Sequence, residues 1–209
     1  MVKSNFNITV SGVVSTLKKN KKKLLKLRKP SKSNKGKRGQ QLEIILGIPN
    51  GNSLTDMTDG ELKSYTRGES IAVTQLKHCL NEIINKKIAF HNSKVGIKMK
   101  QTIYVAFYKK SGTYKDYTVL NKKTHKKHYQ HLKEDYEYIC NQIVKNYKKK
   151  TELHTITGPN NLLQIRTKDS KNKYGLYNPL MFQNWQAKNK NMAFYLTAEF
   201  GKQLFQRWV

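Results

Sequence analysis

Asp56, Glu61 and Lys63 bring two carboxylates and one ammonium close together in the sequence, with Asp59 between them. Glu61-Leu62-Lys63 has the composition of a strand, and strand alternation would place Glu61 and Lys63 on one face and Leu62 on the other. Carboxylate oxygens can hold Mg²⁺ and a nearby cation can position or activate a water, as metal-dependent phosphodiester hydrolysis requires. A lysine-rich chain also contains a Glu-x-Lys triplet by chance, so other features must support this hypothesis.

A further carboxylate, Glu43, lies on a predicted helix upstream. Residues 40–46 have the apolar spacing of a helix, and Gly47 and Pro49 supply the signals that end one. Glu43 is the only acidic residue before Asp56. A single helix carboxylate is most often a solvated surface group, so a surface role and a site role both remain open here.

The composition is strongly basic. The 209 residues include 41 Lys and Arg against 13 Asp and Glu, which gives a formal net charge of +28. A charge of that size attracts polyanions, so nucleic acid is the expected partner. This length allows one domain, or two closely packed lobes, with a substantial core.

The sequence shows no apolar run of about 18 residues that could span a bilayer, and no signal-peptide pattern at its start. We therefore expect a soluble, intracellular protein without a membrane partner, in the cytoplasm, or in the nucleus or a virion if its source is eukaryotic or viral. Cys79 and Cys140 match no CxxC spacing and suit a reducing compartment as core thiols.

Residues 1–34 are predicted to form a basic N-terminal arm and helix. Apolar residues recur at helical spacing from Val10 to Leu27, interrupted by a lysine run that we expect to be a solvated face near phosphates. A targeting signal is the less favoured interpretation of that run. Residues 31–39 contain no apolar residue and are predicted to form a loop that is exposed and mobile until it meets an anion.

Strands are predicted over residues 60–66, 70–75 and 101–107, with a hairpin turn at 66–69 joining the first two. A helix over 75–86 follows the second strand. These elements favour an α/β or α+β sandwich.

The later part of the chain is predicted as a polar excursion and then a long helix with one apolar face. The expected elements are the excursion 109–127, the helix 128–148, a strand at 161–166, an aromatic core segment at 177–185, a strand at 192–196 and a closing helix at 197–209. His125, His128 and His131 match no zinc spacing. We expect them to be solvated or to face phosphates, with a metal site as the less favoured interpretation.

Four stretches resemble, in order, those of a known nuclease family. They are residues 39–47, Asp56 with Gly60-Glu61-Leu62-Lys63, residues 163–168, and Phe194-Tyr195-Leu196 with Phe200. From residue 35 to residue 209 the chain is similar to MutH-type mismatch-repair nicking endonucleases and to the related restriction endonucleases that cut at GATC, within the PD-(D/E)xK nuclease superfamily.

The resemblance implies an α/β fold with a restriction-endonuclease-like mixed β-sheet flanked by helices, in two lobes around a DNA-binding cleft. It also implies that Asp56, Glu61 and Lys63 form the metal-binding and water-activating triad. Glu43 would be an additional carboxylate near the metal, and Lys98 a second active-site lysine.

The resemblance further implies residues that contact DNA. The counterparts of Arg166 and Lys168 read bases or reach the DNA, and the counterpart of Tyr195 contacts the adenine region and senses its methylation. Lys37 and Arg38 are additional DNA-binding candidates. Without the family, Arg166 would be a phosphate-binding arginine and Tyr195 a core aromatic residue.

The sequence also departs from the family pattern. The interval between Asp56 and the Glu-x-Lys is short, so Asp59 is an alternative metal ligand, and Lys100 is an alternative to Lys98. Residues 1–34 match poorly, so we place the endonuclease domain at 35–209.

The expected function is a Mg²⁺-dependent, sequence-specific double-stranded DNA endonuclease of the restriction type, acting at GATC or a related site as a monomer or homodimer, with Mn²⁺ as a substitute cofactor. One alternative is a repair endonuclease that nicks DNA and needs a repair-protein activator. Another is a non-catalytic basic nucleic-acid-binding protein, in which Glu61 and Lys63 form only a weak surface pair.

Overall fold

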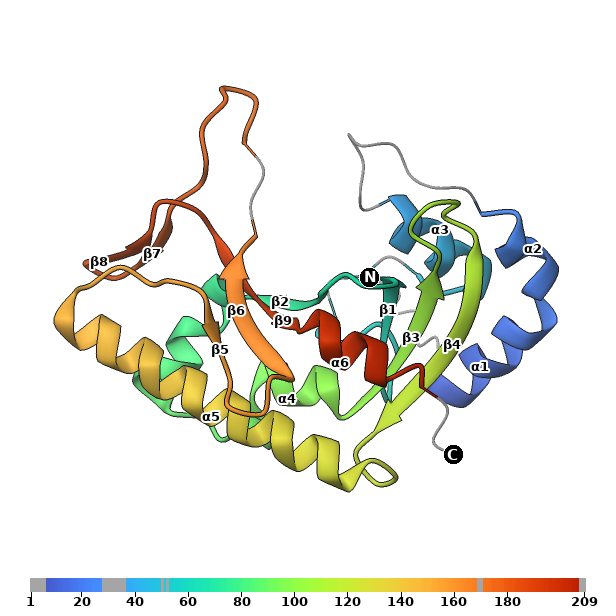
Figure 1. Ribbon diagram of the computed structural model, residues 1–209, viewed down its shortest axis with the longest axis horizontal. Coiled ribbons are helices and arrows are strands. Elements are labelled where there is room, and N and C mark those ends of the chain that lie inside the picture. The colour runs from blue at the N-terminus through green and yellow to red at the C-terminus, as the bar shows by residue number, and fades with distance from the viewer. Residues whose placement is uncertain (1–6, 28–36, 50, 52, 169–170, 207–209) are drawn as a thin grey trace, which may run out of the picture. The chain divides into compact units, whose positions relative to one another are not determined.

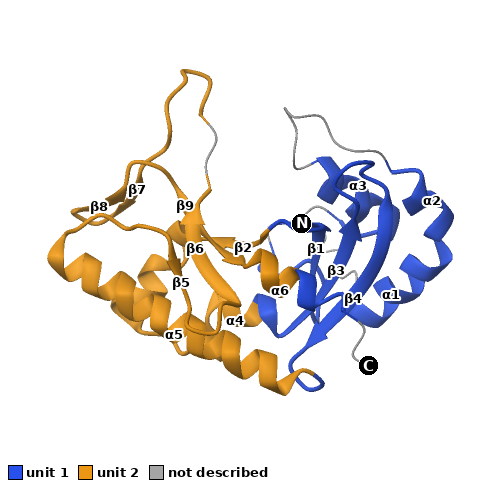
Figure 2. Ribbon diagram, in the orientation of Figure 1, with its two compact units in different colours: residues 1–69, 98–124, 202–209 blue, residues 70–97, 125–201 orange. Residues whose placement is uncertain are grey.

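The computed structural model describes residues 7–27, 37–49, 51, 53–168 and 171–206. The chain is a mixed α/β protein with several small sheets. It divides into unit 1, residues 1–69, 98–124 and 202–209, and unit 2, residues 70–97 and 125–201 (Figure 2). No helix in the described part of the chain is long and apolar enough to cross a membrane.

The sheet of unit 1 is mixed and has the strand order β1-β3-β4. Its strands are β1 (Glu61–Thr66), β3 (Gln101–Phe107) and β4 (Tyr114–Asn121). β1 and β3 run parallel with Glu61 opposite Thr102, whereas β3 and β4 are antiparallel. The parallel pairing places the beginnings of β1 and β3 side by side.

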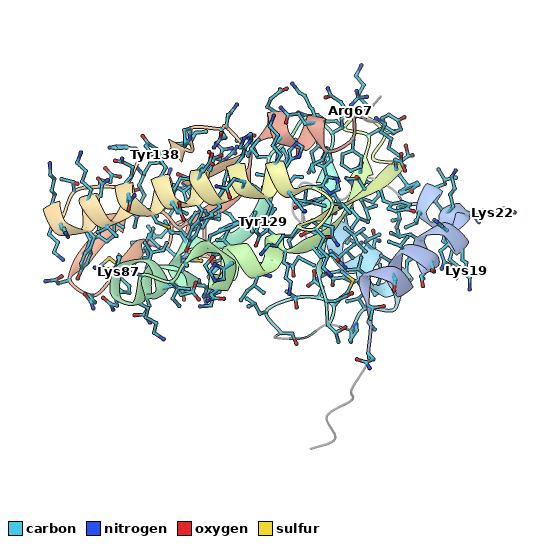
Figure 3. The ribbon with its side chains drawn as sticks, turned by 90° about the horizontal axis from the view of Figure 1, so that it is seen from below. Lys19, Lys22, Arg67, Lys87, Tyr129 and Tyr138 are labelled. Carbon is cyan, nitrogen blue, oxygen red and sulfur yellow. The ribbon has the colours of Figure 1, made fainter. Side chains whose placement is uncertain are left out.

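Three helices cover one face of this sheet (Figure 1). They are α1 (Val10–Lys19), α2 (Lys21–Leu25) and α3 (Lys37–Leu46). Their apolar positions and those of the strands form one core, which includes Val10, Val13, Leu17, Leu24, Leu42, Leu46, Leu62, Ile103, Val105 and Phe107. The lysines of α1 and α2 are exposed, and Lys19 and Lys22 extend outward (Figure 3).

The N-terminal helix prediction is confirmed in part. The predicted helix over 10–27 is interrupted at Asn20, which separates α1 from α2. We expected residues 1–34 to be a separate arm; the described part of that segment, 7–27, instead packs into the core of unit 1. α3 begins at Lys37 rather than at residue 40, so the predicted loop 31–39 falls largely outside the described residues.

Two predictions in the middle of the chain were wrong. The turn after β1 does not close a hairpin, because β1 pairs with β3 and β2 (Ile71–Gln75) belongs to another sheet. The predicted polar excursion contains β4, an edge strand in which Tyr114 and Leu120 are buried and the other residues are half-buried or exposed. Edge strands face solvent on one side and therefore carry a weak apolar signal.

The main sheet of unit 2 is antiparallel with the order β2-β9-β6-β5, beside a separate β7-β8 pair. Besides β2, its strands are β5 (Ile156–Thr157), β6 (Leu163–Thr167), β7 (Leu180–Phe182), β8 (Trp185–Lys188) and β9 (Met192–Leu196). The long helix α5 (Lys126–Lys149) packs against β5 and β6, close to the predicted bounds 128–148.

Short helical segments occupy the region after β2 and the end of the chain. In place of one helix over 75–86, the structure has η1 (Leu76–His78) and η2 (Glu82–Lys86), and η3 (Phe90–Asn92) and α4 (Lys94–Met99) follow them. The closing helix, predicted over 197–209, is the shorter α6 (Ala198–Gln203), and residues 207–209 lie outside the described part of the chain.

Candidate active site

Glu61 lies at the start of β1 and is only 1% exposed. Its Oε1 accepts hydrogen bonds from the ammonium groups of Lys63 and Lys98, the latter at 2.7 Å. Lys98 belongs to the last turn of α4, immediately before β3, so the parallel β1/β3 pairing brings it to Glu61. Thr102 donates its hydroxyl to the Lys98 carbonyl at 2.7 Å and helps to fix that turn.

Alternation along β1 separates the polar cluster from the core, as the sequence predicted. Glu61 and Lys63 share one face of the strand, while Leu62 is buried among the apolar residues of α1 to α3. This packing anchors the strand that carries both charged groups.

Asp56 is linked to this cluster through backbone and side chain. Its Oδ2 accepts the amide of Leu62 at 2.9 Å, and its own amide donates to Glu61 Oε2 at 3.2 Å. The Lys63 ammonium lies 3.8 Å from Asp56 Oδ2. Both carboxylates and both lysines therefore form one connected network.

Glu43 lies within electrostatic range of this network. It is half-buried on α3, and partial burial raises the pKa of its carboxyl above the ordinary value. The negative charges of Asp56 and Glu61 also raise that pKa, while Lys63 opposes them.

Asp59, the alternative ligand, has a different environment. Its Oδ1 accepts the backbone amide of Val10 at 2.7 Å, and its Oδ2 accepts the side-chain amide of Gln101 at 3.4 Å. The Val10 amide is one of the first-turn donors of α1 that have no partner within the helix. Asp59 thus satisfies a helix terminus, and the geometry favours Asp56 as the partner of Glu61.

The donor set suits a magnesium ion. No group of three or more His, Cys, Asp or Glu side chains among the described residues is arranged to hold a metal by itself. Mg²⁺ typically uses one or two protein carboxylates and takes its remaining ligands from water and substrate phosphates. Asp56 and Glu61 are two carboxylates of the kind that such an ion would use.

A pocket adjoins the site within unit 1. It has a volume of about 300 Å³ and is lined by Asp56 together with Ile8, Pro49, Gly51, Ser53, Thr55, Met57 and Thr58. Asp56, one of the two candidate ligands, therefore borders open space.

The predicted DNA-contacting residues of the C-terminal part lie on two neighbouring strands of unit 2. Arg166 on β6 and Tyr195 on β9 share a sheet face, with the guanidinium 5.1 Å from the centre of the ring. Arg166 is exposed and donates to the Ser70 hydroxyl at 3.2 Å. Burial raises the pKa of Tyr195, and Arg166 opposes that rise. Lys168, just beyond β6, is also exposed.

Lys37 and Arg38 occupy different environments at the start of α3. Lys37 is exposed, but Arg38 is 6% exposed, with its guanidinium 4.5 Å from the centre of the Phe107 ring. Arg38 donates to Thr66 and to the Gly112 carbonyl, and burial lowers its pKa. We expected both residues to bind DNA, but in this structure the Arg38 side chain instead connects α3 to the sheet.

The sequence did not identify Thr102 as a positioning residue. Strand alternation places its side chain on a face, but only the β1/β3 register shows that it lies opposite Glu61. The chain matches no protein-family model, and no curated protein is significantly similar to it in sequence. The interpretation of the site therefore depends on its own geometry.

Proposed function

We propose that this protein is a Mg²⁺-dependent endonuclease that hydrolyses double-stranded DNA, with a restriction-endonuclease-like fold of the PD-(D/E)xK type. The observation that carries the proposal is the buried Glu61 carboxylate, which contacts Lys63 and Lys98 and lies beside Asp56. A carboxylate pair next to ammonium groups matches the needs of phosphodiester hydrolysis.

Each residue has a chemical role in this proposal. Asp56 and Glu61 would hold the ion, with Glu43 as a further carboxylate nearby. When bound, Mg²⁺ would lower the pKa of a coordinated water and neutralise charge on the scissile phosphate. Lys63 and Lys98 orient the attacking water and stabilise the negative charge that develops on the phosphate oxygens.

The basic surface supports DNA as the substrate. A net charge of +28 favours phosphate binding with a steep salt dependence. Arg166 is exposed and can make bidentate contacts to guanine, with Tyr195 beside it. We place Lys37 and Lys168 among the phosphate contacts.

We favour a restriction-type enzyme that cuts both strands at GATC or a related site without a helper. The large positive charge supports DNA binding by the protein alone. Purified protein with Mg²⁺ should linearise plasmid DNA that carries unmethylated GATC sites, and sequencing of the ends should show one recurring site. Nicking without linearisation, or cutting only after addition of a repair partner, would support the repair-nickase alternative.

The non-catalytic alternative assumed a surface pair of Glu61 and Lys63. Glu61 is buried and contacts a second lysine from another element, so that assumption does not hold for this structure. A purely structural ion cluster predicts DNA binding without cleavage at any Mg²⁺ or Mn²⁺ concentration. That outcome, with folded protein, would refute the enzymatic proposal.

A further inference from the structure

The segment 171–179, which leads into β7, is an extended part of unit 2 that the proposed site does not use. In Figure 1 it projects beyond the ends of β6 and β7, away from α5. Residues 171–177, which we call the 171–177 loop, form a structured turn: the Asn172 amide donates to the Leu176 carbonyl at 2.7 Å. Asn172 Oδ1 accepts the amides of Tyr174 and Leu176, and Gly175 has a φ of +75°.

The turn exposes two large side chains. Tyr174 is 72% exposed and Leu176 is 63% exposed. The amides of Tyr174 and Leu176 both donate to Asn172 Oδ1, which holds the two residues in one short turn although neither side chain is buried. The turn therefore presents two large side chains to solvent within three residues of each other.

Lysines lie close to the rings of Tyr174 and Tyr177. The Lys173 ammonium is 4.9 Å from the centre of the Tyr174 ring. Lys171 and Lys190 lie 5.8 Å and 4.2 Å from the centre of the Tyr177 ring. The sequence has no acidic residue between Asp169 and Glu199, so every charged side chain of this stretch is basic.

We propose that the 171–177 loop is a second DNA contact, in which lysines bind phosphates and Tyr174 and Leu176 enter a groove against the bases. This inference rests on the proposed function, because it takes the substrate duplex as the ligand. Lysines with interleaved aromatic residues match nucleic acid, where cations meet the backbone and rings meet bases. Apolar side chains inserted between base steps are an established way to hold or bend a duplex.

Binding measurements with the full-length chain test this proposal. The probe is a fluorescently labelled 20-base-pair duplex in metal-free buffer, followed by anisotropy as a function of salt. Tyr174→Ala should weaken binding by about 5- to 100-fold, the range for loss of one base-stacking contact. Tyr174→Phe keeps the ring and should bind as the unmodified protein does. Lys171→Gln with Lys173→Gln should reduce the slope of log K against log salt by about 2.

Matched controls come from α5, on the other side of unit 2. Tyr138→Ala removes an exposed tyrosine, and Lys148→Gln with Lys149→Gln removes the same charge. Both should leave affinity closer to that of the unmodified protein than the loop variants do. Equal effects of loop and control variants would overturn the proposal, because they would show a general charge effect.

Two further outcomes separate the proposals. If the unmodified protein cleaves plasmid DNA but Tyr174→Ala and Leu176→Ala bind the duplex normally, the loop proposal fails and the proposed function stands. If the protein neither binds the duplex nor cleaves plasmid, the proposed function fails as well. Loss of binding to phosphatidylserine vesicles, rather than to DNA, in the Tyr174→Ala variant would assign the loop to a lipid surface and overturn the DNA contact.

Discussion

The Lys98 ammonium lies 2.7 Å from the Glu61 carboxylate, although 37 positions separate the two residues. The parallel pairing of β1 with β3 creates this contact, since each residue lies at or just before the start of its strand. Lys63 lies two residues after Glu61 on β1, on the same face of the strand. One carboxylate thus receives ammonium groups from two elements.

Glu61→Gln, Lys63→Met and Lys98→Met should each lower Mg²⁺-dependent cleavage by about 100-fold or more, because each removes a charged group from the reacting centre. Plasmid digestion measures the cleavage, and anisotropy with a labelled duplex should show that binding persists. Glu69 and Lys109 provide a matched control, since they form an exposed ion pair in the same unit. The Glu69→Gln and Lys109→Met variants should cleave plasmid DNA at the normal rate. Normal cleavage by all three active-site variants would refute the proposed mechanism.

Asp56 and Asp59 should respond differently to alanine. Asp56→Ala should abolish cleavage and leave the protein folded. Asp59→Ala removes the acceptor of the Val10 amide and should cost about 0.5–2 kcal/mol of stability, with cleavage per folded molecule unchanged. Urea denaturation and plasmid digestion distinguish the two effects. Loss of cleavage in Asp59→Ala, with normal cleavage in Asp56→Ala, would instead identify Asp59 as the metal ligand.

Arg38→Ala should lower stability by about 1–3 kcal/mol, because it removes packing on Phe107 and the bonds to Thr66 and Gly112. The salt dependence of DNA binding should not change, since the guanidinium is buried. The neighbouring variant Lys37→Ala should instead reduce the salt slope by about 1 with little change in stability. A reduced slope for Arg38→Ala would place its guanidinium on DNA.

Gly158 should not tolerate a side chain. Asp135 is fully buried and accepts the amides of Asn160, Leu162 and Leu163, and a Cβ on Gly158 would lie 2.2 Å from Asp135 Cγ. Gly158→Ala should therefore lower the free energy of unfolding by about 1–3 kcal/mol. Gly39→Ala, with open space inside α3, should raise it by about 0.5–1 kcal/mol. The denaturation midpoints of the two variants measure both effects. Equal midpoints for Gly158→Ala and Gly39→Ala would contradict the close packing of Gly158 against Asp135.

Stability should fall as the pH drops below the ordinary histidine pKa of 6.5. His128 stacks on Phe200, and burial lowers its pKa below that value, with His125, His131 and Lys127 adding to the effect. Below pH 6.5 the unfolded chain binds a proton that the folded chain does not, which favours unfolding. His128→Phe should reduce the slope of stability against pH between 7 and 5. Thermal melts measured from pH 7 to pH 5 check this prediction. If the variant and the unmodified protein show the same slope of stability against pH, His128 is not the cause of that slope.

The sequence by itself determined the charge, the long helix α5, strands β1, β3 and β9, and the alternation that separates Glu61 and Lys63 from Leu62. These features follow from local periodicity and composition, which need no knowledge of partners. The tertiary structure alone decided that β1 pairs with β3, that Asp59 accepts the Val10 amide at the start of α1 and that Arg38 is buried. Register, capping and burial depend on contacts between residues distant in the chain, so local sequence patterns cannot specify them.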